Sequence, residues 1–444
     1  MKILLITETL LRNDNNVGNS YSNIFSEMEN VKIDHICCQQ GESQSDIIER
    51  SYQISERQII QNIFHRSIQV GAVEEVGKEC SRHSLEKKSS PKISGVVRKT
   101  YNLMRIFRFQ IFFWIRDAIW GTGRWKSKQL REYLNEVKPD IIFAQLQDRI
   151  YLNKLIVYVK DYLKVPMVLY TWDDVYSLKQ FSFSPFWWID RFMQRRKIRS
   201  VVKRCDRIYT ISKEQADEYE GYFHKKCRIL YKGYQFHGDT PAIVCPSYPI
   251  KMVYTGNLYG GRLKTITLLC KEIHKLNHAG IKIQLYIYSA TPLLKRQVKH
   301  LNLEKSTFFC GQITSEEVKR VQKTADILLH VEDFGTKGSL STRLSFSTKI
   351  VDYFLEKKCI VAIGAERCSS IKYVERNDSA IIINNKHKIF QTLQEIADNP
   401  QIIGMYAQKA WDCGKRNHEI EQIQKKLYED LNSVVVQSNK SSGK

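Results

Sequence analysis

The chain lacks the features that mark exported, zinc-binding or membrane-spanning proteins. Its eleven cysteines include no C-x-x-C pair and mostly stand among apolar residues, which favours reduced thiols over a disulfide framework or a zinc site. No uninterrupted apolar run approaches the roughly 18 residues that a membrane-spanning helix needs. The apolar start of the chain, residues 1–7, is too short for an export signal and predicts a β-strand. We therefore expect a cytoplasmic protein.

Acidic residues are scarce relative to basic ones. The 444 residues hold 69 Lys and Arg against 47 Asp and Glu, which gives a formal charge of +22. Such an excess indicates an anionic partner, and nucleic acid, an anionic lipid surface and a phosphorylated small molecule all qualify. A hydrophobic content of 43% indicates globular cores rather than disorder. The length suggests two or three domains.

Strand and helix patterns alternate along most of the chain, which is typical of parallel βαβ units. The segment 42–90 is polar and helix-prone and carries no clear site signal. Before residue 237 we expect strands at 2–7, 32–38, 139–144, 165–171 and 206–212, and helices near 20–29, 125–137 and 186–204. After residue 250 we expect strands at 251–255, 281–289, 306–310, 326–331 and 360–362, and helices at 265–278, 293–301, 315–324 and 349–357.

Glycine and proline interrupt this alternation between residues 238 and 250, so this segment is the predicted linker. It separates an N-terminal domain, 1–237, from a C-terminal domain, 251–402. The remainder, 403–444, is expected to form a helix that packs back towards the N-terminal domain, followed by a disordered tail. The predicted class is α/β, with two Rossmann-like, doubly wound parallel sheets that face a cleft.

A polar, hydroxyl-rich segment precedes one of the predicted helices. Ser347, Thr348 and Lys349 offer two hydroxyls, one ammonium and the free backbone N–H groups of a helix N-terminus. That combination is typical of a site for phosphate or diphosphate. Asp352 follows one turn later, where a carboxylate can accept hydrogen bonds from the hydroxyls of a ribose. The segment predicts a nucleotide-binding site.

A glycine-rich turn follows the first strand of the second domain. Gly256, Asn257, Arg262 and Lys264 gather just after that strand, at the edge of a parallel sheet where ligands bind. The glycines permit close approach of the backbone, and the two cations can neutralise a diphosphate. Gly311 ends another strand, in a turn whose backbone groups can bind a base.

These elements, in this order, resemble the GT-B glycosyltransferases, specifically the large retaining family four that builds bacterial polysaccharides and glycolipids. The likeness covers nearly the whole chain. Its elements are residues 204–212, 229–233, 256–264, 309–311, 325–326 and 347–352. It implies that the N-terminal domain binds the acceptor and the C-terminal domain the nucleotide sugar.

That family places two carboxylates, usually eight positions apart, against the donor sugar and the ribose. Asp352 occupies the second position, but the residue eight positions earlier is Leu344. Glu332 resembles the first carboxylate, with a longer insertion behind it. The resemblance implies that Glu332 contacts sugar hydroxyls and that Asp352 holds the ribose. A solvated loop residue is the alternative interpretation of Glu332.

Two segments of the N-terminal domain complete the expected site. Gly18 and Asn19 would lie beneath the donor diphosphate and offer backbone N–H groups. Asp173 and Asp174 end a strand on the same side of the sheet. Asp173 is the expected catalytic carboxylate, which would orient the acceptor hydroxyl or contact the donor sugar. The alternative is that either aspartate caps a helix.

The resemblance also implies a mechanism. Retaining members of the family react on one face of the sugar, and the leaving diphosphate helps to remove the acceptor proton. Stabilisation of that diphosphate then dominates catalysis. Arg262, Lys264 and Lys349 suit this task without a metal ion, and the sequence holds no Asp-x-Asp motif. We expect no metal and no cofactor beyond the nucleotide-sugar co-substrate, with Asp173, Glu332, Arg262 and Lys349 as the catalytic residues.

Basic residues cluster in two segments of the N-terminal domain. Residues 91–131 hold ten Lys or Arg against the single acid Asp117, and within them residues 104–120 mix arginines with aromatics at helical spacing. Residues 191–207 hold eight basic residues against one acid, behind an aromatic segment at 181–188. Such a mixture is typical of an interfacial helix on an anionic membrane. Aromatic core residues beside a solvated basic face are the alternative.

Together these features predict a metal-independent, hexosyltransferase-type glycosyltransferase on the inner face of the cell membrane. It would move a sugar from UDP or GDP to a glycan or lipid-linked acceptor in cell-surface polysaccharide synthesis. The alternatives are a basic membrane- or nucleic-acid-binding protein with an inactive GT-B fold, and a sugar-nucleotide epimerase. Nucleic acid is not the expected partner, because no nucleic-acid-binding motif is recognisable. An epimerase would need clustered acid–base residues, which the sequence does not show.

Overall fold

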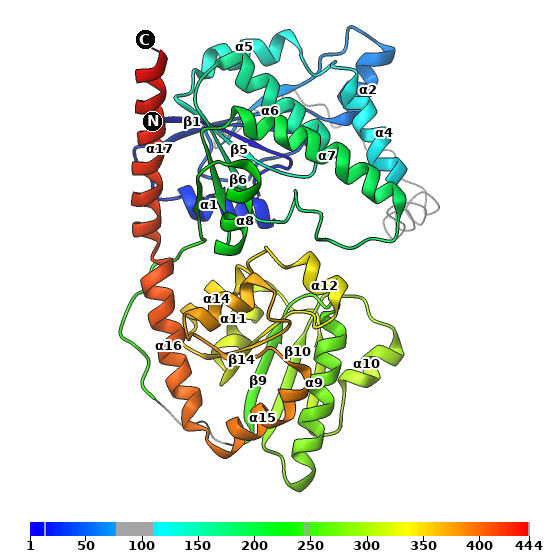
Figure 1. Ribbon diagram of the computed structural model, residues 1–444, viewed down its shortest axis with the longest axis vertical. Coiled ribbons are helices and arrows are strands. Elements are labelled where there is room, and N and C mark those ends of the chain that lie inside the picture. The colour runs from blue at the N-terminus through cyan, green and yellow to red at the C-terminus, as the bar shows by residue number, and fades with distance from the viewer. Residues whose placement is uncertain (13–14, 77–109, 244–245, 247, 443–444) are drawn as a thin grey trace. The chain divides into compact units, whose positions relative to one another are not determined.

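The computed structural model describes residues 1–12, 15–76, 110–243, 246 and 248–442, which form two compact units (Figure 1). Unit 1 consists of Met1–Thr171, Ser182–Tyr209 and Tyr428–Lys444. Unit 2 consists of Trp172–Phe181 and Thr210–Leu427. The unit boundaries thus lie at residues 171/172, 181/182, 209/210 and 427/428, and none of them falls in the glycine- and proline-rich segment 238–250.

The first sheet has eight strands in the order β4-β3-β2-β1-β5-β6-β7-β8. β1 pairs in parallel with β2 and β5, and the edge strand β4 pairs antiparallel with β3. The central strands are almost continuous apolar runs because both of their faces are buried. The strands are β1 (Lys2–Thr7), β2 (Lys32–Cys37), β3 (Arg50–Gln53), β4 (Ala72–Glu75), β5 (Ile141–Gln145), β6 (Met167–Thr171), β7 (Arg207–Thr210) and β8 (Cys227–Ile229).

The second sheet has six parallel strands in the order β11-β10-β9-β12-β13-β14. The chain works outwards from β9 in one direction and then from β12 in the other, so the strand order reverses between β9 and β12. In open parallel sheets such a reversal is where ligands bind. The strands are β9 (Ile250–Thr255), β10 (Ile283–Tyr288), β11 (Thr307–Gly311), β12 (Ile327–Val331), β13 (Cys359–Ile363) and β14 (Ile381–Ile383).

Helices cover both faces of the second sheet, because alternate strand residues point to opposite sides. Met252 and Leu329 pack with α9, α10 and α15, whereas Val253 and Leu328 pack with α13, α14 and α16. The helices of this unit are α8 (Lys213–Phe223), α9 (Arg262–Leu276), α10 (Lys295–Leu301), α11 (Ser315–Lys323), α12 (Thr336–Ser341), α13 (Lys349–Leu355), α14 (Ser369–Arg376), α15 (Ile389–Asp398) and α16 (Gln401–His418). The predicted class of two Rossmann-like α/β domains is confirmed.

Side-chain caps set several helix starts. Ser55 and Thr314 form capping boxes with Gln58 and Glu317 at the starts of α2 and α11. Helices outside those of the second sheet are α1 (Asn16–Phe25), α2 (Glu56–Phe64), α4 (Gln110–Gly121), α5 (Lys128–Val137), α6 (Ile150–Leu163), α7 (Pro185–Arg204) and α17 (Ile420–Ser442). No helix among the residues that the structure describes is long and apolar enough to cross a membrane.

Three expectations differ from the structure. The first helix begins at Asn16 rather than near residue 20, because the Asn15 side chain caps it through the N–H of Gly18. The helix-prone segment 42–90 contains β3, α2 and β4 within its described part. The expected disordered tail is wrong, since α17 continues to Ser442.

The single helix expected within 403–444 is instead two helices, α16 and α17, separated at Glu419. The break has a local cause: the N–H of Tyr234 donates to the carbonyl of His418 at 2.8 Å, and the N–H of Ile420 donates back to Tyr234 at 3.0 Å. Glu419 takes an extended backbone there. A passing strand-like segment therefore inserts into the hydrogen-bond ladder and ends α16.

Candidate functional site

The candidate site of unit 2 lies at the carboxyl ends of β9 and β12, the reversal point of the sheet. These two strands pair only through Ile327 with Met252 and Leu328 with Val253, and beyond them the ladder stops. A cavity of about 100 Å³ lies where the pairing ends. Its lining comes from the strand ends, the glycine turn and the start of α13: Tyr254, Thr255, Asn257, Arg262, Leu329, His330, Val331, Ser347, Lys349 and Tyr353.

Arg262 is fixed in this cavity by three hydrogen bonds. It begins α9 directly after Gly261, so that its side chain returns towards the end of β12. Its Nε donates to the carbonyl of Val331 at 3.0 Å, one Nη to Glu332 at 2.9 Å and the other to Asn257 at 3.1 Å. One carbonyl at the end of β12 and two side chains thus hold the guanidinium.

Lys349 enters the same cavity from the first turn of α13. Its ammonium donates to the carbonyl of Thr255 at 3.1 Å. A Cβ on residue 256 would lie 2.7 Å from that ammonium, so glycine at this position leaves room for the lysine. Burial and the positive charge of Arg262 lower the pKa of Lys349. Two cations drawn together in this way favour an anion between or beside them.

Glu332 is buried at the end of β12, with only 3% of its surface exposed. Burial raises the pKa of this carboxyl, while the charge and hydrogen bond of Arg262 oppose the rise. His330 Nε2 lies 3.5 Å from the other carboxylate oxygen. Burial, together with the charges of Arg262 and Lys349, lowers the pKa of His330 to about 3, so its ring is neutral. Glu332 is therefore not a solvated loop residue.

The glycine turn closes over Asp333, which the sequence did not single out. A Cβ on Gly261 would lie 2.1 Å from the Asp333 carboxylate, and one on Gly338 would lie 2.2 Å from it. Gly261 has φ +90°, a conformation that glycine adopts readily. Asp333 also accepts a hydrogen bond from the N–H of Gly335 at 2.9 Å. This carboxylate thereby packs closely against the turn that precedes Arg262.

The remainder of the predicted nucleotide-binding segment lies beside the cavity. Ser347 lines it, and Thr348 is the N-cap residue of α13 without a side-chain cap bond. Asp352 is not among the lining residues. Its Oδ1 accepts hydrogen bonds from Lys232 at 3.0 Å and from the Tyr234 hydroxyl at 2.6 Å.

Of the predicted donor-binding residues of unit 2, Gly256, Glu332, Thr348 and Asp352 border the cavity without being among its lining residues, and Lys264 and Gly311 also lie outside the lining. Lys264 is exposed on the first turn of α9. Gly311 ends β11 with φ +75°, and its carbonyl accepts a hydrogen bond from the N–H of Ser289 at 2.8 Å. Each residue follows the end of a strand or turn, as the sequence predicted, but neither joins Arg262 in the cavity lining.

The predicted N–H donors of unit 1 are already hydrogen-bonded within their own helix start. The N–H of Gly18 donates to the Asn15 side chain at 2.6 Å, and that of Asn19 donates to the Asn15 carbonyl at 3.0 Å. A Cβ on Gly18 would lie 2.2 Å from the carbonyl oxygen of Arg12. Close packing of the backbone explains the glycine here.

The two aspartates after β6 have different surroundings, both within unit 2. Asp174 is buried, accepts hydrogen bonds from the N–H of Ser177 at 2.8 Å and forms an ion pair with Arg343 at 3.3 Å. It caps a turn rather than a helix. Asp173 is exposed and accepts a hydrogen bond from the Ser345 hydroxyl at 2.8 Å. Asp173 is therefore the more accessible of the two carboxylates.

Sequence reasoning missed Tyr254, His330 and Asp333. Tyr254 and His330 lie inside predicted strands, where the pattern of apolar residues identifies them only as core residues. They line the cavity because the hydrogen-bond ladder between β9 and β12 stops early, which the sequence does not show. Among the residues that the structure describes, no group of three or more His, Cys, Asp or Glu is placed to hold a metal ion.

No known family model and no curated protein matches the chain. Solved structures match it over nearly its whole length at low sequence identity. HepE of Anabaena, solved in complex with UDP, aligns with a TM-score of 0.60 and 10% identity, and the alignment covers 98% of this chain and 100% of HepE. The same protein was also solved with UDP-glucose.

Two further structures agree. Sucrose-phosphate synthase of Thermosynechococcus elongatus aligns with a TM-score of 0.58 and 11% identity, over 97% of this chain and 99% of that one. A glycosyltransferase of Rickettsia africae aligns with a TM-score of 0.55 and 11% identity, over 98% of both chains. At such identities the likeness shows the fold, and the predicted GT-B fold is confirmed.

Proposed function

We propose that this chain is a glycosyltransferase that takes a sugar from a nucleoside-diphosphate donor, with UDP or GDP as the nucleotide. One observation carries the proposal: Arg262 and Lys349, from separate segments of the chain, meet in one cavity at the reversal point of the sheet. A diphosphate is the ligand that two fixed cations at such a position suit best. The structures of HepE with UDP and with UDP-glucose, which share the fold, support it.

The cations would act on the leaving group. As the bond between sugar and diphosphate breaks, negative charge grows on the diphosphate oxygens, and donors that are already in place stabilise that charge without reorganisation. Arg262 is preorganised by Val331, Glu332 and Asn257, and Lys349 by Thr255. We propose that these two side chains replace a metal ion in this role, and that the donor is the only co-substrate.

The carboxylates would bind the sugar. Glu332 keeps one oxygen on Arg262, and its other oxygen lies near His330, so a hydroxyl of the donor sugar would donate to that second oxygen. Asp352 would hold the ribose after exchanging one of its two present partners. Asp173 would orient the acceptor hydroxyl. We propose retention of the anomeric configuration, since Arg262 and Lys349 serve departure of the diphosphate and no strong base lies among the residues lining the cavity.

The acceptor is proposed to be a glycan or a lipid-linked saccharide in cell-surface polysaccharide synthesis, at the inner face of an anionic membrane. Support comes from unit 1, where α7 exposes Phe186, Ile189 and Phe192 at a spacing of three residues and then carries a run of arginines and lysines. Aromatic side chains followed by cations suit the boundary between acyl chains and phosphates. The first basic segment, 91–131, lies partly outside the described residues.

Calorimetry with UDP, GDP and their sugars tests the donor. We expect heat and a raised melting temperature with one nucleotide, since a ligand at about 100 times its Kd stabilises the folded state by about 2.7 kcal/mol. The Lys349→Ala and Arg262→Ala variants should lose most of the heat, whereas Lys271→Ala, an exposed lysine on the same helix α9, should keep it. Absence of heat with every nucleotide would refute the proposal.

Product analysis tests the reaction itself. Incubation with the donor that binds and a lipid-linked acceptor should give a glycoside whose anomeric configuration, read from NMR coupling constants, equals that of the donor. Activity should persist in EDTA if Arg262 and Lys349 take the place of a metal. An altered sugar nucleotide in the absence of acceptor would instead indicate an epimerase.

A further inference from the structure

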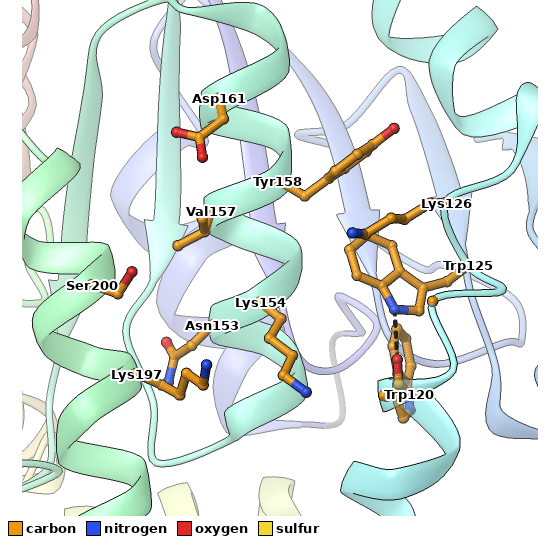
Figure 2. A pocket seen from close by; sticks show the side chains of 12 residues that line it. Trp120, Trp125, Lys126, Asn153, Lys154, Val157, Tyr158, Asp161, Lys197 and Ser200 are labelled. Atoms are coloured by element: carbon orange, nitrogen blue, oxygen red, sulfur yellow. Dashed lines mark hydrogen bonds between the residues drawn. The ribbon is translucent and has the colours of Figure 1, made fainter.

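The outer helices of unit 1 enclose a groove that the donor site does not use. One cavity, of about 390 Å³, lies along α6 between the end of α4 and α7. A second, of about 450 Å³, lies between α4, α6 and α7. Lys154 and Lys197 line both cavities, which therefore adjoin each other. We call the two together the α6 groove, and Figure 2 shows the first of its two parts.

Cations dominate the polar lining of the α6 groove. Lys154 and Lys197 are half-buried, and neither forms an ion pair with any residue in the described part of the chain. Lys126 and Arg196 add two more positive charges. Of the acids in the lining, Asp161 is paired with Arg204 at 2.8 Å. Asp117 also lines the groove and its charge interacts with that of Lys154, so four cations there face two acids. This excess of positive charge favours an anionic ligand.

A buried amide in the α6 groove has an unmet hydrogen bond. Asn153 is 1% exposed and lines the groove. Its Nδ2 donates to the carbonyl of Gln147 at 2.9 Å, but its Oδ1 has no hydrogen-bond partner. Figure 2 shows Asn153 extending from α6 towards α7 and Lys197 extending from α7 towards α6. A buried acceptor of this kind is unfavourable unless a donor, such as a ligand hydroxyl, reaches it.

The other walls of the α6 groove are apolar and continue into an exposed aromatic surface. Trp114, Ala118, Ile150 and Met193 line the second cavity. The Trp114 ring lies 6.0 Å from that of Phe186 on α7, whose outer side also exposes Ile189 and Phe192. Phe183, just before α7, is 87% exposed. The groove therefore opens beside side chains that suit the interface of a bilayer.

We propose that the α6 groove binds the headgroup of one anionic membrane lipid, a phosphodiester that carries a free hydroxyl. Lys154 and Lys197 would bind the phosphate, and the hydroxyl would donate to Asn153 Oδ1. The aromatic side chains of α4 and α7 would enter the bilayer around it. This inference rests on the membrane location in the proposed function and adds to it a defined lipid site.

The chain's own segment 77–109 is a poor candidate for the occupant. It holds nine Lys or Arg against two Glu, so its charge has the same sign as that of the groove. A lipid phosphate has the opposite sign, and it comes with acyl chains that match the apolar walls. Charge complementarity thus selects the lipid.

Flotation with vesicles tests the site. We compare vesicles of phosphatidylcholine alone with vesicles that also contain phosphatidylglycerol, at one salt concentration. The double variant K154A/K197A should bind the second kind about thirtyfold more weakly than the unchanged chain does, since each lysine at a phosphate contributes about a factor of five. The control K128A/K203A removes the same charge from exposed lysines of α5 and α7 outside the groove, and it should lose no more than a few-fold. Equal losses in the two variants would overturn the site.

A second comparison of lipids tests whether the groove recognises the hydroxyl of the headgroup. Phosphatidylethanol has the same charge as phosphatidylglycerol but lacks the hydroxyls. The unchanged chain should prefer phosphatidylglycerol, and Asn153→Leu should abolish that preference even if it weakens binding to both lipids. Soluble glycerol phosphate should compete only weakly, because it lacks the acyl chains. Absence of any preference in the unchanged chain would remove Asn153 from the proposal.

Two controls separate this proposal from its alternatives. If K154A/K197A lost RNA retention on filters as strongly as vesicle binding, the groove would be a general polyanion surface and the lipid proposal would fail. Calorimetry of the unchanged chain with nucleotides is independent of the vesicles. Heat with a nucleotide but no groove-dependent flotation refutes only the lipid site, whereas groove-dependent flotation without nucleotide heat refutes only the donor site.

Discussion

The cavity of unit 2 that we propose for the donor and the α6 groove of unit 1 both gather cations, but they hold these cations differently. Arg262 and Lys349 are anchored by strand-end carbonyls and by Glu332. Lys154 and Lys197 stand on helix surfaces and form no ion pair within the described residues. A site that stabilises charge as a bond breaks needs donors fixed beforehand. A site that only retains a ligand can let flexible lysines adapt to it.

The largest expected effect tests the fixed cations. Arg262→Ala and Lys349→Ala should each lower kcat about 100-fold, because each removes a preorganised donor to the leaving diphosphate. Turnover of the donor with a glycan acceptor measures it, and Lys271→Ala controls for loss of one charge on α9. If both variants kept full turnover with an intact fold, the contrast between fixed and adaptable cations would have no functional meaning.

A glycine pair tests how the fixed site is built. Gly261→Ala places a Cβ 2.1 Å from the Asp333 carboxylate at φ +90°, so both a collision and an unfavourable backbone follow. We expect it to lower the free energy of unfolding by about 3 kcal/mol and to weaken donor binding. Its neighbour Gly260 has φ +64° with no atom within 4 Å of a Cβ, so Gly260→Ala should cost only about 1 kcal/mol. Urea titrations of the two variants measure the difference, and equal losses would contradict the role of Asp333.

The strands of the second sheet could be predicted because they depend on local pattern, and the sequence also singled out Arg262 and Lys349, which the structure brings into one cavity. Apolar runs between turns identify strands, and Arg262 and Lys349 each follow a strand or turn end, the positions at which a parallel sheet gathers side chains. Asp333 and Tyr254 escaped notice because their roles depend on close packing against a glycine turn and on where one ladder stops. Neither property has a signature in spacing.

The α6 groove was out of reach for a related reason. Its walls come from α4, α6 and α7, which are not consecutive, so no single segment displays the groove. The basic and aromatic residues at 104–120 and the basic residues at 191–207 did predict that this domain faces an anionic membrane. That Lys154, within a largely buried helix, joins Lys197 of α7 follows only from how the helices pack. Likewise, only the folded structure shows that Asn153 Oδ1 is buried without a hydrogen-bond donor.

A third substitution tests Asp352, which lies beside the donor cavity and outside its lining. Asp352→Ala should chiefly raise the donor KM, by about tenfold, since a charged hydrogen bond to ribose contributes about 1.5 kcal/mol or more. Lys232→Ala removes one present partner of Asp352 but leaves the carboxylate, so it should change the donor KM less. Steady-state kinetics with varied donor measures both. A change confined to the acceptor KM would assign Asp352 to the other substrate.

The smallest expected effect concerns a carboxyl at the α6 groove. Burial raises the pKa of Asp117 to about 6, and the charge of Asp190 adds to the rise, while a hydrogen bond from the backbone at Tyr151 and the charges of Lys154 and Arg116 oppose it. Between pH values of about 4 and about 6 the folded chain therefore binds more protons at this group than the unfolded chain. The free energy of unfolding falls as the pH rises through that interval.

Asp117→Asn removes this titration, so the variant should gain stability over the unchanged chain at pH 8 and lose that gain at pH 4. Urea titrations at the two pH values measure it, and Asp46→Asn, which removes an exposed carboxylate of the same unit, is the control for one lost charge. A difference that is the same at both pH values would contradict the assignment. In unit 2 the buried Glu332 has Arg262 within hydrogen-bond distance. Among the described residues, Asp117 has no such ion pair. A gain in the stability of Asp117→Asn that depends on pH would therefore distinguish this unpaired carboxyl from the paired Glu332.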